Sequence, residues 1–180
     1  MYKRLLAFTT TVVGVGCVAP TESNTEMDGI YSVDRWTTSA PCEGEAASIE
    51  EEHPPLFWVK YETLLDYAAV SVRTCADLVD CQTQYADDNT LHLGRYVFHD
   101  RDENAWSELE VSARAENDIC VGRVYRHRLE REGADRVRLE TRGRGYFEFA
   151  GQCTNEAALA VDATLPCAEL EVRVGVLVDK

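Results

Sequence analysis

The feature of this sequence that most constrains the fold is an alternation of apolar and polar residues with a period of two. Successive side chains of a β-strand point to opposite faces, so this period predicts half-buried strands. Near the C-terminus, Leu170, Val172, Val174, Val176 and Val178 alternate with Glu169, Glu171 and Arg173. The whole pattern predicts about eight strands, near residues 29–38, 56–65, 67–74, 91–99, 106–116, 119–132, 136–149 and 168–178.

Helical patterns are scarce, and only residues 45–52 and 155–161 are suited to form about two turns each. Neither segment is long enough to cover a sheet, so the strands must bury their apolar faces against one another. The chain has 180 residues, of which 45 % are hydrophobic, and this suits one domain with a packed core. We therefore predict an all-β fold, either an antiparallel up-and-down barrel or a sandwich, with one or two short helices.

The longest predicted hairpin, residues 119–149, can be read in register. A loop at Gly133, Ala134 and Asp135 pairs Glu132 with Arg136, Glu130 with Arg138, Arg128 with Glu140 and Leu129 with Leu139. Residues 121–146 hold eight arginines against four acidic residues. The arginines form either a ladder of exposed ion pairs or a cationic patch for an acidic ligand or glycan. The ladder does not account for Arg126, Arg142 and Arg144.

Seven cysteines in a chain of this length indicate an oxidising compartment. Six of them follow residue 40, and an even number predicts three disulfides with fifteen formal connectivities. Cys75 and Cys81 flank a short polar excursion, and Cys153 and Cys167 flank a helical segment. Local bridges are therefore plausible at both places, which leaves Cys42 to pair with Cys120. No C-x-x-C motif occurs, so we predict no metal site at the cysteines.

The N-terminus has the pattern of an export signal. Lys3 and Arg4 precede an apolar stretch, residues 5–15, that is too short to span a bilayer. Gly16 followed by Cys17 resembles the lipobox of bacterial lipoproteins. The resemblance implies cleavage after residue 16, diacylation of Cys17 and, with Val18 next, transfer to the outer membrane or cell surface. We expect residues 1–16 to be a signal peptide, 17–28 a lipidated flexible tether and 29–180 a single β-barrel domain.

The net charge of −14 argues against binding to nucleic acid or adsorption to anionic lipid surfaces, because both need a basic footprint. No serine-hydrolase, zinc-protease or phosphate-binding motif occurs, and we expect no catalysis and no cofactor. An enzyme would have to use His92, His99, His127 and Asp100. The segment from Asp100 to Asn104 begins like a calcium loop, but Ala105 and Val111 stand where such a loop needs Gly and Glu, so we predict no metal site.

One strand carries the candidate binding residues. Arg123, Tyr125 and His127 alternate on the same face of the strand predicted at residues 119–132, together with Leu129. If this face lines the interior, the charged side chains must either meet an internal carboxylate or line a cavity with a polar end, because buried charge is costly unless paired. We therefore predict that Arg123, Tyr125 and His127 contact a ligand.

Gly29-Ile30-Tyr31, at the start of the first predicted strand, resembles the G-x-W motif of the lipocalin or calycin group in the form G-x-Y. That group consists of eight-stranded barrels that hold small apolar ligands. From the strand count and from Arg123, Tyr125 and His127 we expect a monomeric, non-catalytic domain that binds a small or extended ligand in the barrel interior or at its mouth. The alternative is an envelope protein-protein interaction module, such as a scaffold, adhesin or inhibitor, with the acidic, proline-ended residues 43–55 as its contact loop.

Overall fold

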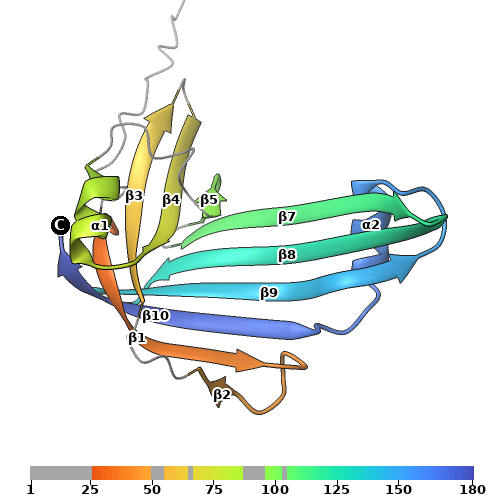
Figure 1. Ribbon diagram of the computed structural model, residues 1–180, viewed down its shortest axis with the longest axis horizontal. Coiled ribbons are helices and arrows are strands. Elements are labelled where there is room, and N and C mark those ends of the chain that lie inside the picture. The colour runs from red at the N-terminus through yellow and green to blue at the C-terminus, as the bar shows by residue number, and fades with distance from the viewer. Residues whose placement is uncertain (1–25, 50–54, 65–66, 87–95, 103–104) are drawn as a thin grey trace, which may run out of the picture.

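The computed structural model of the protein describes residues 26–49, 55–64, 67–86, 96–102 and 105–180 (Figure 1). Its strands are β1 (Gly29–Ser39), β2 (Ala47–Ser48), β3 (Leu56–Leu64), β4 (Tyr67–Cys75), β5 (Tyr96–Phe98), β6 (Asp100–Asp102), β7 (Ala105–Glu116), β8 (Ile119–Arg131), β9 (Arg136–Phe149) and β10 (Glu169–Asp179). The helices are α1 (Leu78–Tyr85) and α2 (Asn155–Asp162).

The strands form one antiparallel sheet in the order β5-β4-β3-β1-β10-β9-β8-β7-β6, with β2 paired to β1. β1 and β10 pair along their whole lengths, although they come from opposite ends of the described chain. β5 also lies against β7, so the sheet curls into a nearly closed barrel. Figure 1 shows β7 to β10 as a long strip of strands from which β3 and β4 turn away steeply. The predicted all-β antiparallel barrel is confirmed.

Seven of the predicted strands are present, with ends that lie within one residue of the predicted ends. Of the strand predicted at 91–99, the structure has β5, and residues 91–95 lie outside the described residues. The predicted helix at 155–161 is α2. The helix predicted at 45–52 is wrong, because residues 47–48 form β2 by pairing with β1, while 50–54 lie outside the described residues.

Helix α1 was not predicted, and its composition explains why. Cys81 is its one buried residue, so the segment lacks the apolar period of 3.6 by which an amphipathic helix is recognised. Local bonds start it instead: the side chain of Asp77, the N-cap, accepts a hydrogen bond of 2.8 Å from the backbone N–H of Asp80. A disulfide from Cys81 to Cys75 then ties the helix to the end of β4.

One half of the barrel interior is filled with apolar side chains, which we call the interior core. Its buried members are Met27, Tyr31, Val33, Phe57, Val59, Val70, Val72, Phe98, Trp106, Leu129, Val137 and Leu139. Tyr31 and Phe57 stack there with ring centroids 5.5 Å apart. Gly175 of β10 makes room for them, because a Cβ at this position would lie 2.5 Å from Cζ of Phe57. The described side chains therefore pack closely in this part of the interior.

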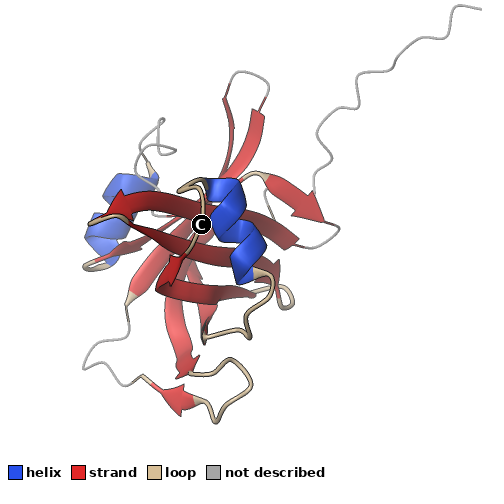
Figure 2. Cartoon of the chain, turned by 90° about the vertical axis from the view of Figure 1, so that its right-hand side faces the viewer, coloured by secondary structure: helices blue, strands red, loops and turns tan. Residues whose placement is uncertain are grey.

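Two smaller apolar clusters lie on the outer faces of the barrel, one under each helix. Ile30, Trp58, Cys75 and Cys81 form the cluster at α1. Cys120, Phe149 and Ala158 form the cluster at α2. Figure 2 shows the two helices at different places around the sheet. Each short helix thus covers an apolar patch that the strands present outward.

The structure contains three disulfides, Cys42–Cys167, Cys75–Cys81 and Cys120–Cys153. The predicted Cys75–Cys81 bridge is present. The predicted Cys42–Cys120 and Cys153–Cys167 bridges are wrong. The pairing of strands decides which cysteines meet, and cysteines that are close along the chain do not always lie close in space.

Two register pairs explain the observed bridges. Ser39, the last residue of β1, pairs with Leu170 of β10, so Cys42 and Cys167 emerge side by side beyond this end. The backbone N–H of Cys42 also donates to the carbonyl of Cys167. Cys120 pairs with the last residue of β9, and Cys153 follows that residue closely along the chain. Helix α2 then separates Cys153 from the start of β10.

The predicted register of the β8–β9 hairpin is confirmed. Arg128 lies opposite Glu140, Leu129 opposite Leu139 and Glu130 opposite Arg138. The backbone N–H of Glu132 donates to the carbonyl of Arg136 at 2.9 Å, which closes the hairpin as predicted. Opposite charges across the strands and one apolar pair therefore set this register.

Residues 27 and 28, which the sequence assigned to the tether, belong to the folded barrel. Met27 is buried in the interior core, and its carbonyl accepts a 2.7 Å hydrogen bond from the hydroxyl of Tyr31. Oδ1 of Asp28 accepts a hydrogen bond of 2.7 Å from the backbone N–H of Tyr61. Residues 17–25 of the predicted tether and the predicted signal peptide lie outside the described residues.

We expect Asp28 to make the protein less stable as the pH rises from 4 to 7. Burial raises the pKa of this carboxyl from 3.8 to about 6 in the folded state. The folded protein therefore binds the proton more tightly than the unfolded chain, so the free energy of unfolding falls as pH rises through this window. Asp28→Asn removes the charge and keeps an acceptor for Tyr61. The urea midpoint of Asp28→Asn should exceed that of the wild type at pH 8 and approach it at pH 4.

The matched control is Asp118→Asn, the same change on an exposed turn. This variant should not reproduce the pH-dependent difference, because the carboxylate of Asp118 stays in water. If Asp28→Asn were less stable than the wild type at pH 8, the hydrogen bond to Tyr61 would outweigh the cost of burying the charge, and the prediction would be wrong.

Candidate functional site

A cavity of about 420 Å³ lies on the inner face of the barrel, beyond the interior core, and we call it the inner pocket. It is lined by Tyr96, Glu110, Arg123, Tyr125, His127, Thr141, Glu169 and Glu171. All except Tyr96 come from β7, β8, β9 and β10. Cross-strand pairing brings them together, since Tyr125 lies opposite Glu110 and Thr141 lies opposite both His127 and Glu171.

The same strand face builds both the core and the inner pocket. On β8, Leu129 points inward and is fully buried in the interior core, and His127 and Tyr125 follow at every second position. On β9, Leu139 and Thr141 repeat this change from apolar to polar. The composition of this face thus changes along the barrel axis, from aliphatic side chains to side chains that form hydrogen bonds. The interior therefore has one packed end and one polar end.

Arg123, Tyr125 and His127, the three residues predicted to contact a ligand, all line the inner pocket. The predicted sharing of one strand face therefore describes their geometry correctly. Their role toward a ligand stays a prediction.

His127 is the most buried polar group of the inner pocket, with 4 % of its surface exposed. Its Nδ1 lies 3.0 Å from the hydroxyl of Thr141, and its Nε2 lies 3.4 Å from a carboxylate oxygen of Glu110. The rings of Tyr96 and Tyr125 flank it, with centroids 4.7 and 6.1 Å away. These contacts hold the imidazole in one orientation at the back of the pocket.

Arg123 forms an ion pair with Glu110, so its charge meets a carboxylate of the same pocket, which is one of the two arrangements expected for this side chain. Its guanidinium also lies over the ring of Tyr125, 5.8 Å from the centroid. Burial and, second, the negative charge of Glu169 raise the pKa of the Tyr125 hydroxyl. This hydroxyl therefore keeps its proton near neutral pH and can donate a hydrogen bond.

Sequence reasoning missed the carboxylates of the inner pocket because it placed the polar faces of two strands outside. In β7, Glu110 points inward, whereas Leu109 points outward and is 43 % exposed. Val111, on the same outward face as Leu109, packs against the cluster under α2. In β10, Glu169 and Glu171 likewise line the interior. Alternation shows that a strand has two faces, but it does not show which of them a helix will cover.

The other candidate residues lie apart from the inner pocket. His99 is exposed, and its Nδ1 lies 3.0 Å from a carboxylate oxygen of Glu108. Asp100 and Asp102 are exposed on β6. His53 and His92 lie outside the described residues, as does Cys17, the predicted lipidation site. Of the predicted contact loop at 43–55, residues 43–49 and 55 are described, and most of these side chains are exposed.

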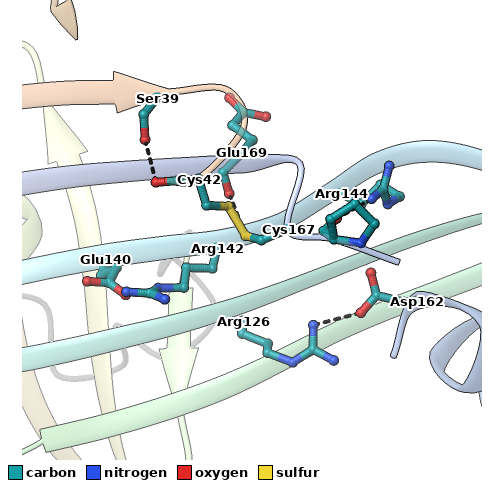
Figure 3. The surroundings of a disulfide bond; sticks show 10 residues. Ser39, Cys42, Arg126, Glu140, Arg142, Arg144, Asp162, Cys167 and Glu169 are labelled. Atoms are coloured by element: carbon teal, nitrogen blue, oxygen red, sulfur yellow. Dashed lines mark hydrogen bonds and ion pairs between the residues drawn. A yellow bond between two sulfur atoms is a disulfide. The ribbon is translucent and has the colours of Figure 1, made fainter. Parts of the chain in front are cut away.

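The three arginines that an ion-pair ladder left unexplained, Arg126, Arg142 and Arg144, lie around the Cys42–Cys167 disulfide (Figure 3). Arg126 donates to Asp162 of α2 at 2.8 Å, Arg142 pairs with Glu140, and Arg144 donates to the carbonyl of Pro166. Arg126 and Arg142 lie opposite each other on β8 and β9, where like charges repel. Their acidic partners offset that repulsion, so the structure favours ion pairing over a free cationic patch.

Within the described ranges, no group of three or more His, Cys, Asp or Glu side chains is arranged to hold a metal ion. None of the helices in the described part of the chain is long and apolar enough to cross a membrane.

Comparison with family models, curated proteins and solved structures finds no match to this chain.

Proposed function

We propose that this protein is a non-catalytic binding domain that takes a small polar ligand in the inner pocket and is held at a bacterial membrane by a lipid on Cys17. The observation that carries the proposal is a cavity of about 420 Å³ on which Glu110, Arg123 and Tyr125 converge. Ligand sites of proteins have volumes of about 300–1,000 Å³ and a few well-placed polar groups.

The packing of the barrel supports a polar ligand in the inner pocket. The lipocalin resemblance implies an apolar ligand inside the barrel, but the interior core occupies that space. Glu110 and Arg123 are 40 % and 35 % exposed, so water and small molecules reach them. His127 and Thr141 are fixed by their mutual contact. Groups that are held in place before binding lose little entropy when a ligand arrives.

The ligand proposal is tested by nuclear magnetic resonance titration with small alcohols, carboxylates and amines. We expect saturable shifts at Tyr96, Tyr125, His127 and Thr141. Thr141→Trp should weaken the binding by about tenfold or more, because the indole takes up the volume that a ligand needs. The matched control Thr83→Trp puts the same side chain on the exposed surface of α1 and should leave the affinity unchanged.

Two outcomes contradict the proposal. If bound compounds shift resonances elsewhere and leave the inner pocket unchanged, the ligand site is misplaced. If no compound binds, the protein-interaction alternative replaces the small-ligand proposal. Shift mapping on the wild type decides between these outcomes even if Thr141→Trp fails to fold.

The membrane anchor is supported by Lys3, Arg4, the apolar run at 5–15 and the Gly16-Cys17 pair. In a bacterial host that processes lipoproteins, the full chain should incorporate labelled palmitate and sediment with the membranes. Cys17→Ser should do neither, because it removes the thiol that is acylated. Val18→Ala serves as the control and should label normally. Equal labelling of Cys17→Ser and wild type would exclude this anchor.

A further inference from the structure

The acidic groups of the inner pocket outnumber its basic group. Three glutamates and one arginine line it. Two of the carboxylates are neutralised: Arg123 pairs with Glu110, and Nε of Arg173 donates to Glu171 at 2.6 Å. Glu171 also accepts a hydrogen bond of 2.9 Å from Nε1 of Trp36.

Glu169 is the remaining carboxylate. It has no ion-pair partner within the described part of the chain, and its charge helps to raise the pKa of the Tyr125 hydroxyl. Figure 3 shows Glu169 beside the Cys42–Cys167 disulfide, which fixes the start of β10 against the end of β1. Glu169 is an exposed residue of the pocket lining, so the inner pocket carries one negative charge that is open to solvent and has no cationic side-chain partner in the described part of the chain.

Two tyrosines provide aromatic surface in the same pocket. Tyr125 carries Arg123 over its ring, so it already acts as a partner for a cation. Tyr96 lies across the pocket against His127. The faces of tyrosine rings are electron-rich and attract ammonium groups within about 6 Å. An anion, in contrast, would meet three carboxylates and one arginine that is already paired.

We infer that the inner pocket binds a small organic cation, with an amine or quaternary ammonium group held between the carboxylate of Glu169 and the rings of Tyr125 and Tyr96. This inference rests on the proposed function and names its ligand class. The cation supplies the charge that Glu169 lacks, and the volume of about 420 Å³ limits the ligand to a small molecule.

The test compares probes that differ only in charge. Choline and 3,3-dimethyl-1-butanol have the same shape, but a carbon replaces the charged nitrogen in the alcohol. Butylammonium and acetate extend the set to a primary amine and an anion. We expect the cations to bind in the inner pocket about tenfold or more tightly than the alcohol, because only a positive charge is attracted by the carboxylate of Glu169 and by the faces of the tyrosine rings. Acetate should not bind there, and added salt should weaken the cations alone.

Two variants test whether Glu169 is the source of the preference for a charged ligand. Glu169→Gln keeps the shape of the side chain and removes its attraction for a cation, so it should lower the affinity for choline about tenfold, while the affinity for the alcohol should stay unchanged. Glu156→Gln makes the same change on the exposed first turn of α2, outside the inner pocket, and should have no effect on either probe.

The outcomes separate this inference from the proposed function. If the alcohol or acetate binds in the inner pocket as tightly as choline, the protein is a small-ligand binder of another class, and the cation inference alone is overturned. The same holds if Glu169→Gln binds choline as the wild type does. If none of the probes and no compound of the wider titration reaches the inner pocket, both proposals fail.

Discussion

Replacing Cys42 and Cys167 by serine is expected to lower the free energy of unfolding by about 5 kcal/mol, the largest loss among the three bridges. The bridge spans 125 residues, so it removes more entropy from the unfolded chain than bridges that span 33 or 6 residues. The same relation gives losses of about 4 kcal/mol for the Cys120–Cys153 bridge and about 2 kcal/mol for the Cys75–Cys81 bridge.

Urea denaturation of the three double-serine variants checks this order. The Cys75–Cys81 variant is the matched control, because it has the same chemical change and a much shorter loop. The Cys42–Cys167 bridge also holds β1 against β10 beside Glu169, so its loss should weaken ligand binding in the inner pocket as well. If the short bridge cost more than the long one, native-state contacts rather than loop entropy would govern the stability that disulfides add.

The second large effect is expected at Trp58. Trp58→Ala should lower the free energy of unfolding by about 3–5 kcal/mol, because it empties a fully buried site between β3 and α1. Nε1 of Trp58 also donates to Gln84 of α1 at 3.2 Å. A helix of eight residues is not stable alone, so α1 depends on this contact and on the Cys75–Cys81 bridge. Urea denaturation measures the loss, and amide exchange should show α1 opening first.

Val79→Ala is the control for this variant, since Val79 is on the same helix and is 70 % exposed. Its effect should stay within about 0.5 kcal/mol. Trp58→Phe keeps most of the packing and removes the hydrogen bond to Gln84, so its cost should lie between the two. Equal stability of Trp58→Ala and Val79→Ala would show that α1 is not held by this side chain.

The inner pocket illustrates how far sequence reasoning reaches. Arg123, Tyr125 and His127 were predictable because they alternate on one strand, and a period of two places them on one face. Glu110, Thr141 and Glu169 were not, because they reach the pocket through the pairing of four strands. The predicted arginine, tyrosine and histidine therefore share the pocket with three carboxylates that were not predicted.

The sequence by itself determined the seven long strands, the β8–β9 register and the cysteines that form disulfides, because these depend on local alternation, on neighbouring charges and on the even number of cysteines after residue 40. Only the tertiary structure decided which faces of β7 and β10 point inward, which cysteines of distant segments meet, and that α1 forms. These features depend on which surfaces are covered once the sheet has curled. Which face is buried depends on the closed barrel. Helix α2 covers the outward apolar face of β7, and the carboxylates of β7 and β10 line the inner pocket.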